Sequence, residues 1–334
     1  MSRRREGWLA VGVALGLAAC GRGGPTGTDA STGTPSTGTP STGAAASTTA
    51  RASASADAGS DADAAVALDA SAPFLGGVPT SAKSIGHTSI VFKIELSTGA
   101  KAAFKPASRR GPLRYKGEVA AYRLARLLEI LNVPRAFFRT FEASTLLAAK
   151  GADEMIVKEG VVKGALIPWI PDLGFLALEQ APLSGEWKQW LRKGSPIPDD
   201  KRALAAQIST LVAFDYITGN WDRWSGGNVG LDKATGTLLY IDNDGAFFEV
   251  APQDGLSRNK KLLAGVDKFS FALVTQLRLV DEAEITRAIG EESPGVPLLS
   301  QKALAGVLQR RTELLEVVNA KLKANGEVET YLHP

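Results

Sequence analysis

The sequence predicts an α+β fold in which a small β-rich lobe precedes a larger, mainly helical lobe. Short runs of alternating apolar residues lie between about residues 84 and 171. Long runs with helical spacing dominate residues 172–334. Both follow a change to mixed globular composition near Pro73, which leaves about 260 residues, enough for one large domain or two lobes that share a cleft.

The first 20 residues have the features of an export signal. A positive segment at residues 3–5 precedes an apolar segment at residues 8–17, which is too short to span a bilayer. Residues 17–20, Leu-Ala-Ala-Cys, resemble the bacterial lipobox, where the signal is cut before the cysteine and the cysteine is lipidated. Cys20 is the only cysteine of the chain and cannot form an internal disulfide. We therefore expect an exported lipoprotein anchored through Cys20 to the inner or outer membrane of a bacterial envelope; the alternative is an ordinary secretory signal with an incidental cysteine.

Residues 21–72 are expected to be a disordered tether. They consist mainly of Ser, Thr, Gly, Ala and Pro, including the near-repeat "STGTPSTGTPSTG". Such a segment has too few large apolar side chains to offset the entropy of ordering. The folded domain is then residues 73–334, and no segment in it is long and apolar enough to cross a membrane. A formal charge of +3, without a dense basic run, gives no support for nucleic-acid binding.

A hairpin and a helix open the first lobe. Residues 89–96 alternate between apolar and polar side chains, and a glycine-containing turn leads to a second short run that ends at Lys105. Residues 116–131 have helical spacing and are followed by Asn132 and Pro134, which favour a helix stop. Further strands are expected near residues 135–141, 154–158 and 161–170.

The second lobe places a polar loop between a long helix and another hairpin. Residues 199–219 have helical spacing and end at Gly219, a typical helix terminator. The loop "GNWDRWSGGN" follows, and residues 228–242 read as a hairpin that ends at Asp242. An amphipathic helix is expected over residues 300–326.

This order of elements suits phosphoryl transfer, which requires positioning and charge neutralisation more than covalent chemistry. Asp222 in the loop can accept the proton of an acceptor hydroxyl, and Asp242 can hold a metal that bridges nucleotide phosphates. Lys105 at a strand end of the other lobe can hold the phosphates. Glu118, early in the next helix, can orient that lysine or help to bind the metal.

Four segments in this order resemble the atypical kinases of the secretory pathway, the Golgi casein kinase and xylosyl kinase family, and more distantly the type II phosphatidylinositol 4-kinases. They are "FKP" at residues 104–106, "EVAA" at 118–121, "GNWDR" at 219–223 and "IDNDG" at 241–245. The resemblance spans roughly residues 84–249. It implies a bilobal protein-kinase-like fold with a β-rich N-lobe and a helical C-lobe.

The resemblance also implies a set of site residues. Lys105 would contact the phosphates of ATP, Glu118 would pair with it or reach the metal, Asp222 would be catalytic, and Asp242 would bind Mg²⁺ or Mn²⁺. Gly86 stands where the family has its phosphate-covering loop. Asn228 is a further candidate metal ligand, six residues after Asp222, with the pair Gly226-Gly227 absorbing a longer spacing than usual. Asp244 adds a carboxylate where the family tends to have glycine.

The acceptor would be a protein Ser or Thr or a sugar hydroxyl. Two other classes remain open at this point: a nucleotide-binding or scaffolding pseudokinase, and a ligand-binding lipoprotein without phosphate chemistry. A pseudokinase would be expected to lose the lysine, the catalytic aspartate or the metal aspartate, and all three are present. Each residue also has a structural interpretation, since Asp commonly caps turns and Glu commonly decorates a first helical turn.

The lipobox gives the first testable prediction. We expect Cys20→Ala to abolish lipidation and to leave the protein uncleaved at this site or released in soluble form. Incorporation of labelled fatty acid and partitioning into detergent measure the effect. Unchanged values for both would contradict the lipoprotein assignment.

Overall fold

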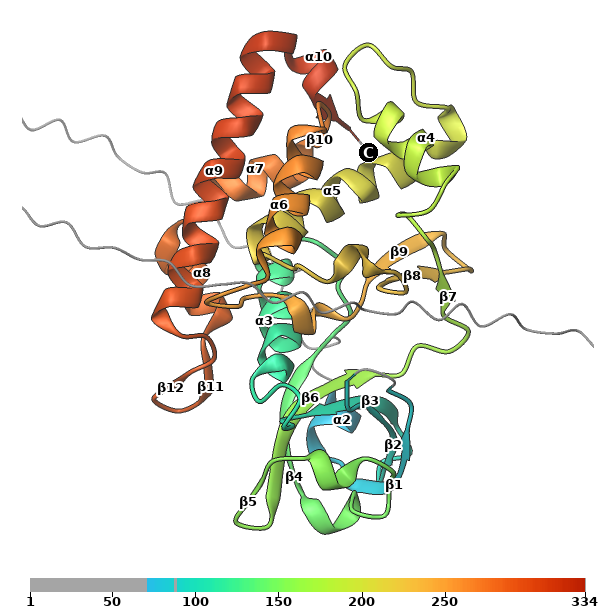
Figure 1. Ribbon diagram of the computed structural model, residues 1–334, viewed down its shortest axis with the longest axis vertical. Helices are drawn as coiled ribbons and strands as arrows, with labels where there is room; N and C mark the ends of the chain where they lie inside the picture. Colours follow the sequence, from blue (N-terminus) through green and yellow to red (C-terminus); the bar gives the residue numbers. More distant parts are fainter. Residues whose placement is uncertain (1–70, 87–88, 334) are drawn as a thin grey trace, which may run out of the picture. The chain divides into compact units, whose positions relative to one another are not determined.

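The N-terminal lobe is built on a curled antiparallel sheet (Figure 1). The structure, a computed structural model, describes residues 71–86 and 89–333. The expected signal peptide with Cys20 and most of the expected tether lie outside these residues. The strands β1 (Pro79–Ser84), β2 (Phe92–Leu96), β3 (Lys101–Pro106), β6 (Val161–Pro168) and β4 (Phe137–Glu142) pair in this order, and β5 (Val157–Lys158) also pairs with β6.

The predicted hairpin is β2–β3, with Phe92 opposite Phe104 and Glu95 opposite Lys101. Its alternating apolar side chains, with those of β4 and β6, form the core of this lobe; Phe104 and Phe141 meet edge to face at 5.0 Å. The sheet begins at β1, upstream of the first predicted strand. The sequence of β1, an edge strand, is mostly polar and three of its six residues are exposed, so it shows little apolar alternation.

The helix α3 (Arg114–Leu127) follows β3 and begins at Arg114 rather than at the predicted Lys116. Its buried residues, including Val119 and Leu124, belong to the large hydrophobic core that it shares with the helical lobe, whereas the strands β2 and β3 belong to a second core. The helix ends at Leu127, and Glu129 takes a positive φ of 56°. The chain therefore turns before Leu131, the last residue of the predicted helix.

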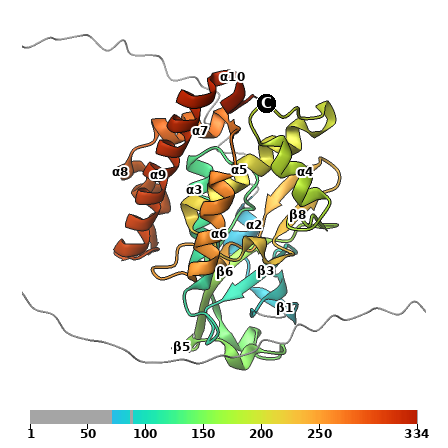
Figure 2. The same ribbon diagram turned by 45° about the horizontal axis from the view of Figure 1, so that its top comes forward.

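The C-terminal lobe is mainly helical (Figures 1 and 2). Its helices are α4 (Leu183–Trp190), α5 (Arg202–Thr218), α6 (Gln253–Ala264), α7 (Phe271–Leu279), α8 (Glu282–Ile289), α9 (Gln301–Asn325) and α10 (Glu327–Thr330). Short strands connect them: β7 (Gly174–Phe175), β8 (Val229–Asp232) and β9 (Thr237–Tyr240) form one sheet, β10 (Phe269–Ser270) pairs with β13 (Tyr331–Leu332), and β11 (Glu291–Ser293) pairs with β12 (Val296–Pro297). A helix α2 (Ala72–Gly76) precedes the first sheet. Among the described residues, no helix is long and apolar enough to span a membrane.

Short 3-10 turns complete the chain: η1 (Ala143–Thr145), η2 (Ala152–Glu154), η3 (Asp199–Lys201), η4 (Arg223–Ser225) and η5 (Asn243–Gly245). The predicted helix over residues 199–219 is therefore divided into η3 and α5. It ends as expected at Gly219, whose left-handed φ of 63° closes the helix. The hairpin β8–β9 and the helix α9 are confirmed. The helix α5 is buried along its second half between neighbouring elements, which holds the loop at its end in a fixed place.

Candidate active site

Lys105 joins the two lobes. It lies at the end of β3, and its ammonium group donates to Glu118 of α3 and to Asp242 Oδ1 at 2.6 Å, beyond the end of β9. Its side chain is 11% exposed, so the pairing takes place largely out of water. Burial lowers the pKa of Lys105, but the carboxylates of Asp242 and Glu118 outweigh burial and raise it above its usual value. The lysine is therefore a permanent positive charge.

A short turn after β9 carries two aspartates of different character. Asp242 adopts a left-handed conformation, with φ of 56°, and its side chain is 36% exposed. Burial raises its pKa, but Lys105 outweighs this effect and keeps the pKa below the usual value. Asp244 is only 5% exposed and lies 3.8 Å from Lys105 and 3.4 Å from Arg114. Burial, with a smaller contribution from the neighbouring carboxylates, raises the pKa of Asp244 to about 7.

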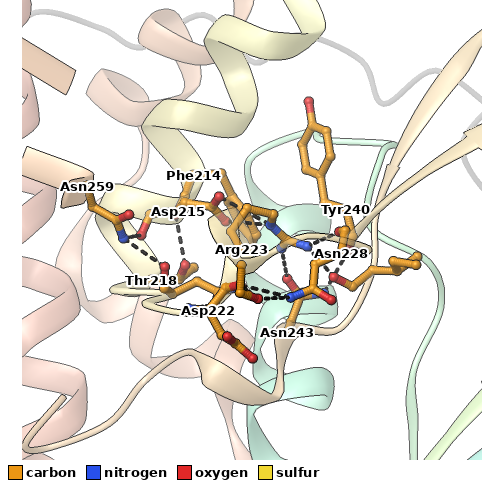
Figure 3. Close-up of polar contacts among 12 residues, drawn as sticks. Phe214, Asp215, Thr218, Asp222, Arg223, Asn228, Tyr240, Asn243 and Asn259 are labelled. Atoms are coloured by element: carbon orange, nitrogen blue, oxygen red, sulfur yellow. Dashed lines mark hydrogen bonds and ion pairs between the residues drawn. The ribbon is translucent and has the colours of Figure 1, made fainter. Parts of the chain in front are cut away.

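Asp222 and Asn228 lie in the loop after α5. The Asn228 amide nitrogen donates to the backbone carbonyl of Asp222 at 2.8 Å, which leaves its amide oxygen for other partners. Gly226 and Gly227, with φ of 101° and 76°, turn the chain between them in conformations that favour glycine. Figure 3 shows the Asp222 carboxylate pointing away from the surrounding polar contacts. Among the described residues, none donates a hydrogen bond to that carboxylate.

The guanidinium of Arg223 holds this loop in place (Figure 3). It is buried and pairs with Asp215 of α5 at 3.1 and 3.2 Å. It also donates to the backbone carbonyls of Asn228 and Ile241 and, at 2.6 Å, to Asn243 Oδ1. One side chain thus fixes the loop against both the preceding helix and the turn after β9. Burial raises the pKa of Asp215 to about 6, although Arg223 opposes the shift.

Two glycines allow the segments around the site to approach closely. A Cβ atom on Gly117 would lie 2.5 Å from the Asn243 carbonyl oxygen, so only glycine lets α3 pack against η5. A Cβ atom on Gly245 would lie 2.9 Å from Asp222 Cβ. Such distances are below ordinary contact distances, and the two glycines therefore set the separation of Glu118, Asp222 and Asp242.

Two neighbouring cavities share Lys105 and Asp242 among their lining residues. The first, of about 510 Å³, is polar and is lined by Asp222, Asn228, Asp242, Asp244, Arg114 and other residues. The second, of about 630 Å³, is more apolar, with Val91, Ala103, Ile167 and Trp169 among its lining residues. Gly86, in the loop between β1 and β2, lines the second cavity. Only glycine fits at this position, because a Cβ atom would lie 2.0 Å from the Ser89 carbonyl oxygen.

The arrangement is compatible with a metal bound together with its substrate. Among the described residues, no group of three His, Cys, Asp or Glu side chains forms a metal cage. Mg²⁺ is ordinarily held by one or two carboxylates, with waters and substrate phosphates completing the shell. Asp242 and Asn228, which line one cavity, offer oxygen ligands of that kind.

All six residues predicted from the sequence therefore border the two cavities: Gly86, Lys105, Glu118, Asp222, Asn228 and Asp242. The structural contributions of Gly117, Asp215 and Arg223 were not predicted. The "GNWDR" and "KGE" segments contained the arginine and the glycine, but their roles depend on contacts with other elements of the fold, which the sequence pattern does not show. The same loop carries two tryptophans: Trp224 stacks on Trp187 with ring centroids 5.6 Å apart, and Trp221 lines the first cavity.

Comparison with known proteins establishes the fold. The chain is similar to the structure of hydra Fam20 with sugar, at 15% identity and a TM-score of 0.58, over 78% of this chain and 90% of that one. It is also similar to the Golgi casein kinase with Mn/ADP bound, at 13% identity and a TM-score of 0.57, over 77% and 76% of the two chains. No family model matches, and no curated protein matches the sequence significantly. The protein has a bilobal protein-kinase-like fold.

The Arg223 network gives a prediction about stability. We expect Arg223→Ala to lower the free energy of unfolding by about 3–5 kcal/mol, because it leaves Asp215 buried and unpaired. The double variant Asp215→Ala/Arg223→Ala should lose less than the sum of the two single variants. Denaturant unfolding of the purified protein measures both. Wild-type stability in Arg223→Ala would contradict the anchoring role of this side chain.

Proposed function

We propose that the protein is a kinase that uses ATP with Mg²⁺ or Mn²⁺ to phosphorylate a hydroxyl group of a protein Ser or Thr or of a sugar. One observation carries the proposal. Lys105 is held between Glu118 and Asp242, and the carboxylate of Asp222 faces the same polar cavity. This constellation combines phosphate binding, a candidate metal ligand and a candidate base in one place.

Each residue has a role that its environment supports. The fixed positive charge of Lys105 attracts the phosphates, and Glu118 prevents the ammonium from turning away. Asp242 and the amide oxygen of Asn228 would hold the metal, which neutralises charge on the phosphates when bound. Gly86 and the apolar cavity would accommodate the base of the nucleotide.

The proton of the acceptor is the remaining requirement. As the acceptor oxygen attacks the terminal phosphorus, the bond from that phosphorus to the bridging oxygen breaks, and the acceptor hydroxyl must lose its proton. Asp222 accepts it, since no described residue occupies its carboxylate by hydrogen bonding and the cavity gives it access. The loop that carries Asp222 is held by Arg223, so the base is positioned before the acceptor arrives.

The structural relatives support both acceptor classes, since the similar hydra protein was solved with a sugar and the other is a casein kinase. The lipobox at residues 17–20 adds the proposal that this chemistry takes place outside the inner membrane, on a domain tethered to the bacterial envelope. A kinase in that compartment would depend on exported nucleotide.

Nucleotide binding is the first test. We expect millimolar ATP with Mn²⁺ to raise the melting temperature, because a ligand at a hundredfold excess over its Kd stabilises the folded state by about 2.7 kcal/mol. Asp242→Ala should remove most of this rise. Asp199→Ala is the matched control, since the Asp199 side chain is 93% exposed and is not among the residues that line either cavity. The absence of any shift with ATP or GTP and any divalent metal would contradict the proposal.

Transfer itself tests Asp222. We expect Asp222→Ala to lower the initial rate of phosphorylation by roughly 10²–10⁴-fold, the usual contribution of a general base, while nucleotide-dependent melting survives. A panel of proteins and sugars with labelled ATP supplies the acceptor. A wild-type rate in this variant would show that the loop is structural. Nucleotide binding by the wild-type protein without transfer to any acceptor would instead identify a pseudokinase.

A further inference from the structure

A carboxylate of the helical lobe reaches across to the N-terminal lobe. Glu292, in β11, has a side chain that is 4% exposed and accepts from three donors: Tyr115 Oη at 3.1 Å, Lys116 Nζ at 2.8 Å and Lys163 Nζ at 2.7 Å. Burial raises its pKa, but the hydrogen bonds from the two lysines outweigh burial and keep the pKa below the usual value. Glu292 is thus a buried, fully ionised group that connects β11 with α3 and β6.

Two of the three donors lie on the first turn of α3, immediately before Glu118. Residues three apart on a helix share a face, so a displacement of Tyr115 displaces Glu118 in the same direction. Glu118 holds the Lys105 ammonium. Any contact that fixes the first turn of α3 therefore fixes the geometry of the Lys105–Glu118 pair.

The rest of α3 is attached to the same part of the helical lobe. Arg123 donates to the backbone carbonyls of Ile289 and Glu291, at 2.6 and 2.9 Å. The apolar face of α3 lies in the large core of the helical lobe. Figure 1 shows the β11–β12 hairpin beside the lower half of α3. The helical lobe therefore holds α3 along its length, whereas Lys105 belongs to the sheet of the N-terminal lobe.

We propose that Glu292 is a positioning residue for phosphoryl transfer, which acts by holding the first turn of α3 so that Glu118 stays paired with Lys105. This inference rests on the proposed kinase function.

The test is a double-mutant cycle on transfer. Glu292→Gln keeps the shape of the side chain and removes its charge. We expect it to lower kcat by about 10- to 100-fold, the effect of a small misplacement of positioning groups, with little change in the KM for the acceptor. Since Glu292 acts through Glu118, the variant Glu118→Gln/Glu292→Gln should be no slower than Glu118→Gln alone. Glu291→Gln is the matched control, because Glu291 lies on the same strand but directs its carboxylate to the Gly295 amide.

Hydrogen exchange adds a readout that needs no turnover. Amides of the first turn of α3 should exchange faster in Glu292→Gln than in Glu291→Gln, with all rates measured well below the melting temperature of each variant. An unchanged kcat in Glu292→Gln, unchanged exchange in α3, or rate losses that multiply fully with those of Glu118→Gln would overturn the positioning role in an active wild-type enzyme. If the wild-type protein shows neither transfer nor nucleotide binding, the proposed function itself fails and the positioning role with it.

Discussion

The buried pair of Arg223 and Asp215 is the interaction on which the geometry of the site depends. A guanidinium in the interior is costly to desolvate, and its value lies less in net stability than in the number of groups it fixes at once. Here its planar donors are shared among a helix, the loop that carries Asp222 and the turn that follows Asp242. Those three segments belong to different elements of the helical lobe, and a single rigid group makes their relative positions interdependent.

Lys105 has the corresponding role between the lobes, but with an excess of negative charge around it. Glu118, Asp242 and Asp244 surround one ammonium, and Arg114 reaches Asp244 only at 3.4 Å. The elevated pKa of Asp244 follows from burial together with this excess. A divalent cation bound at Asp242, as proposed above, would offset part of this negative charge.

The sequence predicted the main elements of the fold better than their boundaries, and the residues that it nominated for a site line two adjoining cavities. Lys105, Glu118, Asp222 and Asp242 could be nominated because each lies close to a recognisable strand or helix end, and such ends position side chains through local geometry. The edge strand β1 and the short helices of the second lobe were missed because their patterns are brief and weakly periodic. Glu292 could not be predicted, since its partners Tyr115 and Lys163 are 177 and 129 residues away along the chain.

Arg223 and Glu292 restrict different movements of the chain. Arg223 fixes the loop and the turn within the helical lobe, whereas Glu292 and Arg123 fix a helix of the other lobe against it. With α3 held in this way, the sheet that carries Lys105 is tied to the helical lobe through Lys105 itself and through Lys163 of β6, which donates to Glu292. If the proposed nucleotide binds between the lobes, movement of the sheet away from the helical lobe would require Lys105 to leave Asp242 and Glu118 and Lys163 to leave Glu292, while Asp222 and Asp242 keep their separation. Binding of the nucleotide would thus be coupled to the re-formation of these buried ion pairs, whereas Asp222 and Asp242 would already be in place.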